Sequence, residues 1–247
     1  MQSKRLLYQS EYTTASFKIW EDEDYRWLTI GDSNNFQSKI FKKSPSKLVL
    51  SYLTPMLSSL TFAKNLDNIL MLGLGGGAIL HYLNEYHPKC KVTVIEYNSE
   101  LIEAASELFY FNQLNISFTI ICADAFNYLT EEKTKYDAVL VDVGEINSQQ
   151  YENIFLHMGK AAQERTVCVI NSLCFNQVDA KSVLLSVNEY FMFRCLAVPV
   201  SGTMNLILVI SNKDDFIPQI DQYTAQKKLK LDSSPVTKYG LIGQFLS

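Results

Sequence analysis

The stretch Ile69-Leu70-Met71-Leu72-Gly73-Leu74-Gly75-Gly76-Gly77-Ala78-Ile79-Leu80 decides the fold of this chain. Its apolar beginning predicts a buried strand, its glycines predict a tight turn, and its last residues predict a helix. A second apolar strand follows and ends on Glu96. This order is typical of α/β folds that bind a nucleoside, although the glycines alone also fit a simple strand-to-helix turn. Because glycine lets the backbone approach a ligand and a carboxylate can accept two ribose hydroxyls, we expect an adenosine-type cofactor.

Strands and helices alternate along the chain from residue 69 onward. Apolar strand patterns lie near 69–73, 91–96, 117–122, 136–142 and 165–171, and helical periodicity lies near 77–86, 99–111, 148–162 and 178–189. Right-handed crossovers then give a parallel sheet covered on both faces. Residues 191–198 and 203–211 flank a glycine turn and predict an antiparallel hairpin. The sequence predicts an α/β fold with a doubly wound, mostly parallel seven-stranded sheet and an antiparallel last strand, as in sulfonium-cofactor transferases.

The region before residue 69 has a different pattern. Residues 6–38 alternate in the manner of short antiparallel strands, with turn signals at 21–24 and 31–32. Apolar residues then recur at helical spacing from 48 to 60, after a plausible helix start at Ser44-Pro45-Ser46. We therefore predict a small β-strand appendage over 1–44 and a Rossmann-like, nucleoside-binding catalytic domain over 45–247.

The composition limits the partners of the chain. With 247 residues and 47% hydrophobic content, it can bury a sizeable core. A net charge of −4 argues against a broad nucleic-acid or anionic-lipid surface, leaves a local basic patch possible, and suits a small cationic substrate. The five cysteines and three histidines show neither disulfide nor metal spacing. Without a leader or an apolar run of about 20 residues, a cytoplasmic protein is expected.

Acidic residues follow the later strands at the edge where the nucleoside is expected. Asp124, followed by Ala125, comes after strand 117–122 and can accept an adenine amino group, cap the next helix, or do both. Asp142 ends an apolar strand, so it lies either over the reactive end of a ligand or caps the following loop. Glu145 stands three residues on, across a glycine, and either joins Asp142 on one substrate cation or faces solvent.

These features together resemble a known family over most of the chain. The matching pieces are Gln9-Ser10-Glu11-Tyr12, the segment from Gly31-Asp32 to Gln37-Ser38, the loop from Gly73 to Leu80, Glu96, Asp124-Ala125, the segment from Asp142 to Glu145, and Pro199-Val200-Ser201-Gly202. In their order and context they are similar to the spermidine synthase-like polyamine aminopropyltransferases. The resemblance implies the class I methyltransferase fold.

The resemblance also implies roles for single residues. Asp142 would be the catalytic carboxylate, Glu145 would replace a second, diamine-binding acid, and Gln37 would contact the cofactor near its sulfur. Glu96 would bind the ribose of the cofactor and Asp124 its adenine amine. The full set of cofactor-binding residues would be Gly73, Gly75, Gly77, Glu96, Asp124 and Ala125. The implied reaction transfers an aminopropyl group from decarboxylated S-adenosylmethionine to a small diamine such as putrescine. It would need no metal, and the protein would be a homodimer with neither a nucleic-acid nor a membrane partner.

Departures from the family pattern leave other functions open. The loop Gly75-Gly76-Gly77-Ala78 lacks the acid that holds the aminopropyl amine, Lys42, Lys43 and Lys47 stand in a segment where the family has acids, and Ile146 replaces a proline. A second hypothesis is therefore an S-adenosylmethionine-dependent methyltransferase. A third is a non-catalytic nucleoside-binding relative. A fourth, an NAD-dependent enzyme, is disfavoured by the antiparallel ending and by Asp124-Ala125.

Overall fold

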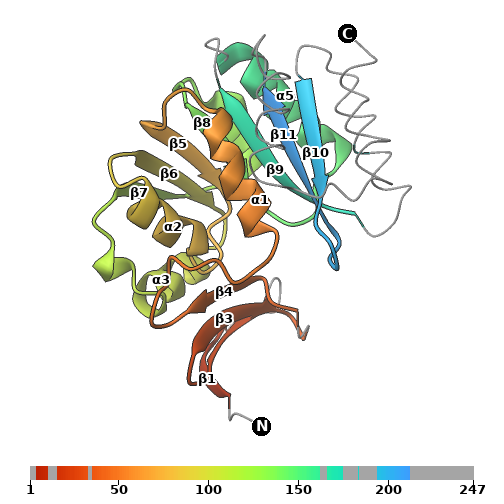
Figure 1. The fold of residues 1–247 in the computed structure, drawn as a ribbon. Coiled ribbons are helices and arrows are strands. Elements are labelled where there is room, and N and C mark those ends of the chain that lie inside the picture. Colours follow the sequence, from red (N-terminus) through yellow and green to blue (C-terminus); the bar gives the residue numbers. More distant parts are fainter. Residues whose placement is uncertain are drawn as a thin grey trace.

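The chain folds into two β-sheets, one small and one large, in a computed structural model (Figure 1). The structure describes residues 4–10, 16–32, 35–161, 166–174, 183 and 194–211. Within these ranges, no helix is long and apolar enough to cross a membrane.

The small sheet is antiparallel and has the order β1-β2-β3-β4. Its strands are β1 (Arg5–Gln9), β2 (Phe17–Glu21), β3 (Tyr25–Ile30) and β4 (Ser38–Phe41). Side chains alternate between its faces, so Phe17, Ile19 and Leu28 are buried against the rest of the protein while their neighbours point outward. The predicted antiparallel appendage is confirmed.

The large sheet has seven strands in the order β10-β11-β9-β8-β5-β6-β7. They are β5 (Asn68–Leu72), β6 (Lys91–Glu96), β7 (Ser117–Cys122), β8 (Ala138–Val141), β9 (Val167–Leu173), β10 (Arg194–Pro199) and β11 (Asn205–Ser211). The strands from β9 to β7 pair in parallel, whereas β11 pairs antiparallel with both β9 and β10. This is the predicted mostly parallel sheet with an antiparallel last strand.

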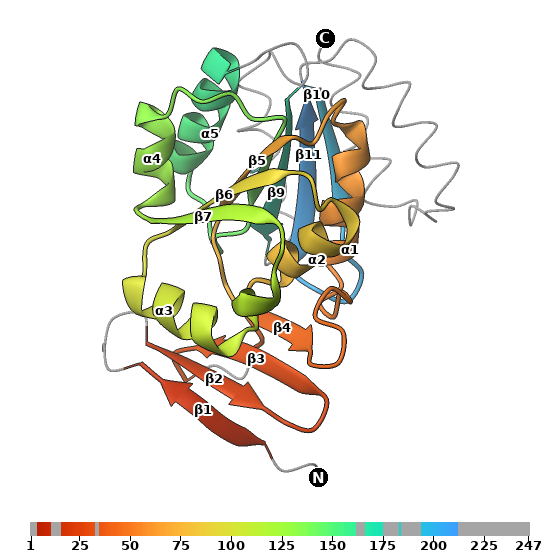
Figure 2. The same cartoon turned by 90° about the vertical axis from the view of Figure 1, so that its left-hand side faces the viewer.

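Helices cover both faces of the large sheet (Figure 2). They are α1 (Leu53–Ser58), the 3-10 helix η1 (Ser59–Phe62), α2 (Ala78–Tyr86), α3 (Ser99–Leu108), the 3-10 helix η2 (Phe111–Gln113), α4 (Ala125–Glu131) and α5 (Ser148–Ala161). Strand β5 explains the two layers, because Ile69 and Met71 pack with α1, α2 and α3 while Leu70 and Leu72 pack with α4 and α5. A strand buried on both faces is apolar throughout, as this one is.

Two predicted helices differ from the observed ones. The helix predicted over 48–60 begins only at Leu53, because Pro55 has no N–H and is tolerated only in a first turn. The helix predicted over 99–111 ends at Leu108, and Tyr110 adopts a positive φ of 60° before the short turn of η2. The helix predicted near 178–189 lies outside the described residues apart from residue 183. The boundary between units 1–44 and 45–247 stays a prediction.

Candidate functional site

One large cavity of about 1160 Å³ opens at the carboxyl ends of the central parallel strands, next to the small sheet. Open α/β sheets bind ligands at this edge. All of the candidate site residues except Gly77 line the cavity, namely Gln37, Gly73, Gly75, Glu96, Asp124, Ala125, Asp142 and Glu145. The cavity therefore brings together three successive acidic strand ends and the glycine loop.

The glycine loop after β5 needs glycine for two different reasons. Gly73, Gly75 and Gly77 all have positive φ angles, of 93°, 53° and 70°, which side chains rarely tolerate. A Cβ on Gly73 would lie 2.3 Å from the Asp142 carbonyl oxygen. The absence of a side chain at Gly73 therefore lets the backbone after β5 approach the backbone after β8. A Cβ on Gly77 would lie 2.3 Å from the Phe111 ring. Gly77 thus permits packing behind the loop, and its assignment to the cofactor stays a prediction.

Glu96 joins the end of β6 to the glycine loop. Its side chain is 7% exposed, and its carboxylate accepts hydrogen bonds from the backbone N–H of Leu74 at 3.2 Å and of Asn98 at 3.0 Å. The two bonds go to different oxygens, and a carboxylate oxygen can accept more than one hydrogen bond. Glu96 is therefore fixed in orientation at the cavity wall and keeps acceptor capacity for a ligand.

Asp124 caps helix α4. Its Oδ1 accepts hydrogen bonds from the N–H of Phe126 at 3.1 Å and of Asn127 at 2.8 Å, which satisfies two free donors of the first turn. The capping role is confirmed. The same exposed carboxylate lines the cavity, so the adenine role is compatible with the cap and stays a prediction.

Asp142 is held by side chains from two other elements. The Tyr52 hydroxyl donates to Oδ2 at 2.9 Å, and the Asn171 amide donates to Oδ1 at 2.8 Å. Asn205 in turn donates to the Asn171 side-chain oxygen at 2.8 Å, which fixes the orientation of that amide. Desolvation raises the pKa of Asp142, and the hydrogen bonds from Asn171 and Tyr52 oppose the rise. Burial beside this carboxylate raises the pKa of Tyr52 well above 10, so Tyr52 stays a donor.

Tyr52, Asn171 and Asn205 were not identified from the sequence. Tyr52 fitted the apolar side of a predicted helix, although it lies just before α1. The two asparagines gave a usable signal, because each is an amide in a mostly apolar strand, and β9 and β11 are neighbours. A buried amide in such a strand needs a partner, and here the partner is a candidate catalytic acid.

The three lysines of the segment where the family has acids contact residues of the small sheet and its turns. Lys42 contacts Glu21 at 3.4 Å and donates to the Asp22 carbonyl, Lys43 pairs with Asp24 at 3.6 Å, and Lys47 lies over the ring of Phe41. None of them lines the cavity. These lysines therefore add no positive charge to the cavity lining.

The charged residues that line the cavity, within the described part of the chain, are all acids. They are Glu96, Asp124, Asp142 and Glu145. No cluster of His, Cys, Asp and Glu among the described residues is arranged to hold a metal ion. The site is thus a negatively charged cavity with a glycine loop at one wall.

Comparisons with known proteins agree with this geometry. Residues 69–164 match the family model of a methyltransferase domain. The chain is 29% identical over 215 residues to a polyamine aminopropyltransferase of Chromobacterium violaceum, covering 85% of this chain and 80% of that one. It is 34% identical over 125 residues to a polyamine aminopropyltransferase of Neisseria meningitidis serogroup A, covering 50% of this chain and 47% of that one. The second match thus spans about half the length of that relative.

Solved structures show the same fold. A probable spermidine synthase from Corynebacterium glutamicum superposes with a TM-score of 0.69 at 20% identity, covering 88% of this chain and 85% of that one. Human methyltransferase-like protein 13, in complex with SAH, gives a TM-score of 0.60 at 18% identity, covering 74% and 93%. Together with the fold and the residues of the cavity, these similarities show that the chain is a transferase with the class I methyltransferase fold, similar in sequence to the spermidine synthase-like polyamine aminopropyltransferases.

Proposed function

We propose that this protein transfers an aminopropyl group from decarboxylated S-adenosylmethionine to a small diamine such as putrescine. The observation that carries the proposal is the charge of the cavity, whose described charged lining residues are four carboxylates. A sulfonium cofactor and a protonated diamine are both cations, so both are attracted to such a site. A volume of about 1160 Å³ leaves room for two reactants side by side.

The residues assigned to the ribose and the adenine support this choice of cofactor. Gly73 and Gly75 keep one wall bare of side chains, Glu96 would accept the ribose hydroxyls, and Asp124 and Ala125 would hold the adenine. Gln37, which is exposed at the cavity, would lie near the sulfur. When bound, the sulfonium cofactor supplies an electrophilic carbon.

The acceptor amine needs to be both aligned and deprotonated. An alkylamine with a pKa near that of lysine, about 10.4, is neutral in only about one molecule in 10³ at neutral pH. Asp142, fixed by Tyr52 and Asn171, would grip the reacting amine and accept its proton as attack proceeds. Desolvation raises the pKa of Asp142, which makes the carboxylate a better proton acceptor. Glu145, exposed at the cavity, would bind the second amine.

The charge of the cavity also favours the decarboxylated cofactor. Intact S-adenosylmethionine carries a carboxylate, and no Lys, Arg or His is among the described lining residues to pair with it. A methyltransferase is the second candidate, because Gly75-Gly76-Gly77-Ala78 has no acid for an aminopropyl amine and the matched family model is a methyltransferase domain. A non-catalytic nucleoside-binding relative is the third.

Product analysis separates these candidates. The protein is incubated with decarboxylated S-adenosylmethionine and putrescine, and separately with S-adenosylmethionine and candidate amines, and the thioether nucleoside and alkylated amine are measured by mass spectrometry. We expect spermidine and methylthioadenosine in the first reaction. Methylated amine in the second reaction alone would show a methyltransferase. No product in either, together with a raised melting temperature on adding cofactor, would show a binding protein.

A matched variant tests the role of Asp142 in the same assay. Asp142→Asn keeps the shape of the side chain and removes its charge, so transfer should fall about 10²- to 10⁴-fold. The cofactor-induced rise in melting temperature should stay, because Glu96 and Asp124 are unchanged. Undiminished turnover would contradict the role. A cytoplasmic homodimer belongs to the same proposal, and sedimentation of the purified protein tests the dimer.

A further inference from the structure

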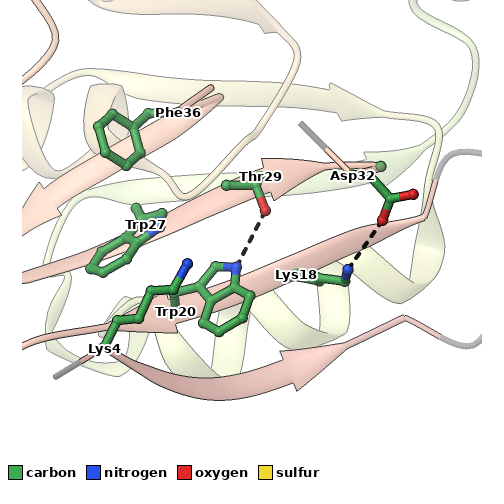
Figure 3. A pocket seen from close by; sticks show the side chains of 8 residues that line it. Lys4, Lys18, Trp20, Trp27, Thr29, Asp32 and Phe36 are labelled. Carbon is green, nitrogen blue, oxygen red and sulfur yellow. Dashed lines mark hydrogen bonds and ion pairs between the residues drawn. The ribbon is translucent and has the colours of Figure 1, made fainter. Parts of the chain in front are cut away.

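The outward side of the small sheet carries a second, chemically different surface, which we name the outer aromatic face. Cross-strand pairing puts Lys18 opposite Thr29, Trp20 opposite Trp27, and Lys39 opposite Trp27, all on the side turned away from the buried core. The face consists of Lys4, Lys18, Trp20, Tyr25, Trp27, Thr29, Phe36, Lys39, Phe41 and Lys47. Figure 3 shows its central part.

This face contains a cavity of about 300 Å³, which is separate from the acidic one except that Phe36 lines both. It is lined by Lys4, Lys18, Trp20, Trp27, Thr29, Gly31, Asp32 and Phe36, so two lysines and one acid border it. The Trp20 indole N–H donates to the Thr29 hydroxyl at 3.3 Å, which fixes that ring. Trp20 thus offers a ring held in place, whereas Trp27 beside it is only 7% exposed.

Lysine ammonium groups lie directly over these rings. Lys4 is 4.5 Å from the centre of the Trp20 ring, and Lys39 is 4.2 Å from the centre of Phe36 and 4.3 Å from that of Tyr25. Lys18 pairs with the fully exposed Asp32 at 3.4 Å. The face thus combines positive charge with aromatic rings, whereas the candidate active site combines negative charge with glycines.

We infer that the outer aromatic face binds single-stranded nucleic acid, with bases stacked on the aromatic rings and phosphates on the lysines. Aromatic side chains interleaved with cations on a sheet are the arrangement that such strands use, because every base has a flat face and every nucleotide a negative charge. A base stacked on a ring gains more than an exposed ammonium loses by moving aside to a phosphate. The width from β1 to β4, about 14 Å at the usual strand spacing, suits a few nucleotides.

Other occupants fit this face less well. A symmetric contact with a second copy would bring two lysine-bearing faces together, and their positive charges would repel. An acidic peptide would match the charge but leave the fixed rings unused. The net charge of −4, from which no nucleic-acid partner was expected, describes the whole chain, whereas the lysines of this face act locally.

The chain reports on this face directly, because Trp20 and Trp27 are its two tryptophans. At about 50 mM salt, we expect a short single-stranded oligouridine to quench the tryptophan fluorescence. A fluorescently labelled copy of the same oligonucleotide should show higher anisotropy when the protein is added. Both effects should be weaker at about 200 mM salt. Lys18→Glu with Lys39→Glu should weaken binding at least about 10-fold. Lys89→Glu with Lys91→Glu, at exposed positions of the large domain, changes the net charge equally and should weaken it less than about 2-fold.

Several results would overturn the inference. One is unchanged fluorescence and anisotropy in the presence of the oligonucleotide at about 50 mM salt. Another is equal weakening by both double variants, which would show attraction to total charge rather than to this face. Equal or tighter binding of poly-glutamate, or of anionic lipid vesicles, would assign the face to a peptide or a membrane. Aminopropyl transfer by the Lys18→Glu, Lys39→Glu protein should equal that of the wild type, which keeps this test apart from the proposed function.

Discussion

Opposing effects act on the carboxylate of Asp142. Desolvation raises its pKa, and the hydrogen bonds from Asn171 and Tyr52 lower it. A carboxylate in a dry site is a stronger proton acceptor than one in water, but only while it stays ionised at the working pH. In the proposed reaction, the two hydrogen bonds would therefore set the lowest pH at which Asp142 is ionised and can align and deprotonate the amine.

Tyr52→Phe should raise the pH at which the rate of transfer falls on the acid side of the pH profile. Removing a donor that lowers the pKa of Asp142 leaves desolvation less opposed, so the carboxyl group protonates at a higher pH. One hydrogen bond is worth about 1 kcal/mol, which corresponds to a shift of about 0.7 pH units. The rate of transfer measured from acid to neutral pH should show this shift, with a loss of about 3-fold at the original midpoint of the limb.

Tyr151→Phe is the matched control. Tyr151 is also buried and hydrogen-bonded, but its hydroxyl contacts Ser172 and it packs in the layer of α4 and α5. Its loss should cost stability without moving the pH profile. An identical profile for Tyr52→Phe and the wild type would show that Tyr52 is structural and does not tune Asp142.

At the scale of elements, the turn from β5 into α2 depends on close packing behind it as well as on backbone conformation. Gly77 and Gly31 both have positive φ angles, of 70° and 59°. A Cβ on Gly77 would meet the Phe111 ring at 2.3 Å, whereas a Cβ on Gly31 would meet nothing within 4 Å. The two glycines separate conformational strain from steric overlap.

Gly77→Ala should therefore destabilise the protein more than Gly31→Ala. Strain in the left-handed region costs about 1 to 2 kcal/mol and applies to both variants. Displacing Phe111 from the core adds about 1 to 3 kcal/mol to the first alone. Urea unfolding measures both free energies. Equal losses would mean that Phe111 moves aside freely and that the loop needs glycine only for its backbone angles.

The sequence predicted the order and direction of the strands because the apolar runs of a doubly buried sheet are long and are separated by clear turns. It also predicted that Glu96, Asp124 and Asp142 would share one edge, since the carboxyl ends of parallel strands meet there. It did not predict the start of α1, which depends on one proline. Nor did it predict the contacts of Asp142 with Tyr52 and Asn171, which come from residues 90 and 29 positions away in the chain.

For the whole molecule, an ion-pair network in the small sheet holds the arginine that contacts the end of α3. Glu21 accepts from Arg26 at 2.7 Å and from Arg5, and Lys42 lies 3.4 Å away. Arg26 also donates to the Leu108 carbonyl at the end of α3 and lies over the Tyr110 ring. Figure 2 shows α3 directly beside the small sheet. The charge of Glu21 thus stabilises the arginine that bridges the two parts.

Lowering the pH should weaken the ion pairs between Glu21 and its arginine partners. Burial raises the pKa of Glu21, but hydrogen bonds from Arg26 and Arg5 outweigh it and lower the pKa from 4.5 to about 2. Because the folded pKa lies below the unfolded one, the contribution of Glu21 to stability is full above about pH 5 and is lost as the pH falls toward 2.

Glu21→Gln should remove that dependence. At pH 7 the free energy of unfolding of the variant should be lower than that of the wild type by about 2 kcal/mol, because Arg26 keeps its charge in a nearly buried place. This difference in free energy of unfolding, the gap, should narrow between about pH 5 and pH 2. Unfolding by urea at several pH values measures the gap. Asp32→Asn, which changes a fully exposed carboxylate that pairs with Lys18, is the control and should follow the wild type throughout. A constant gap for Glu21→Gln would mean that the Glu21 carboxylate does not stabilise the contact between the small sheet and α3 through its charge.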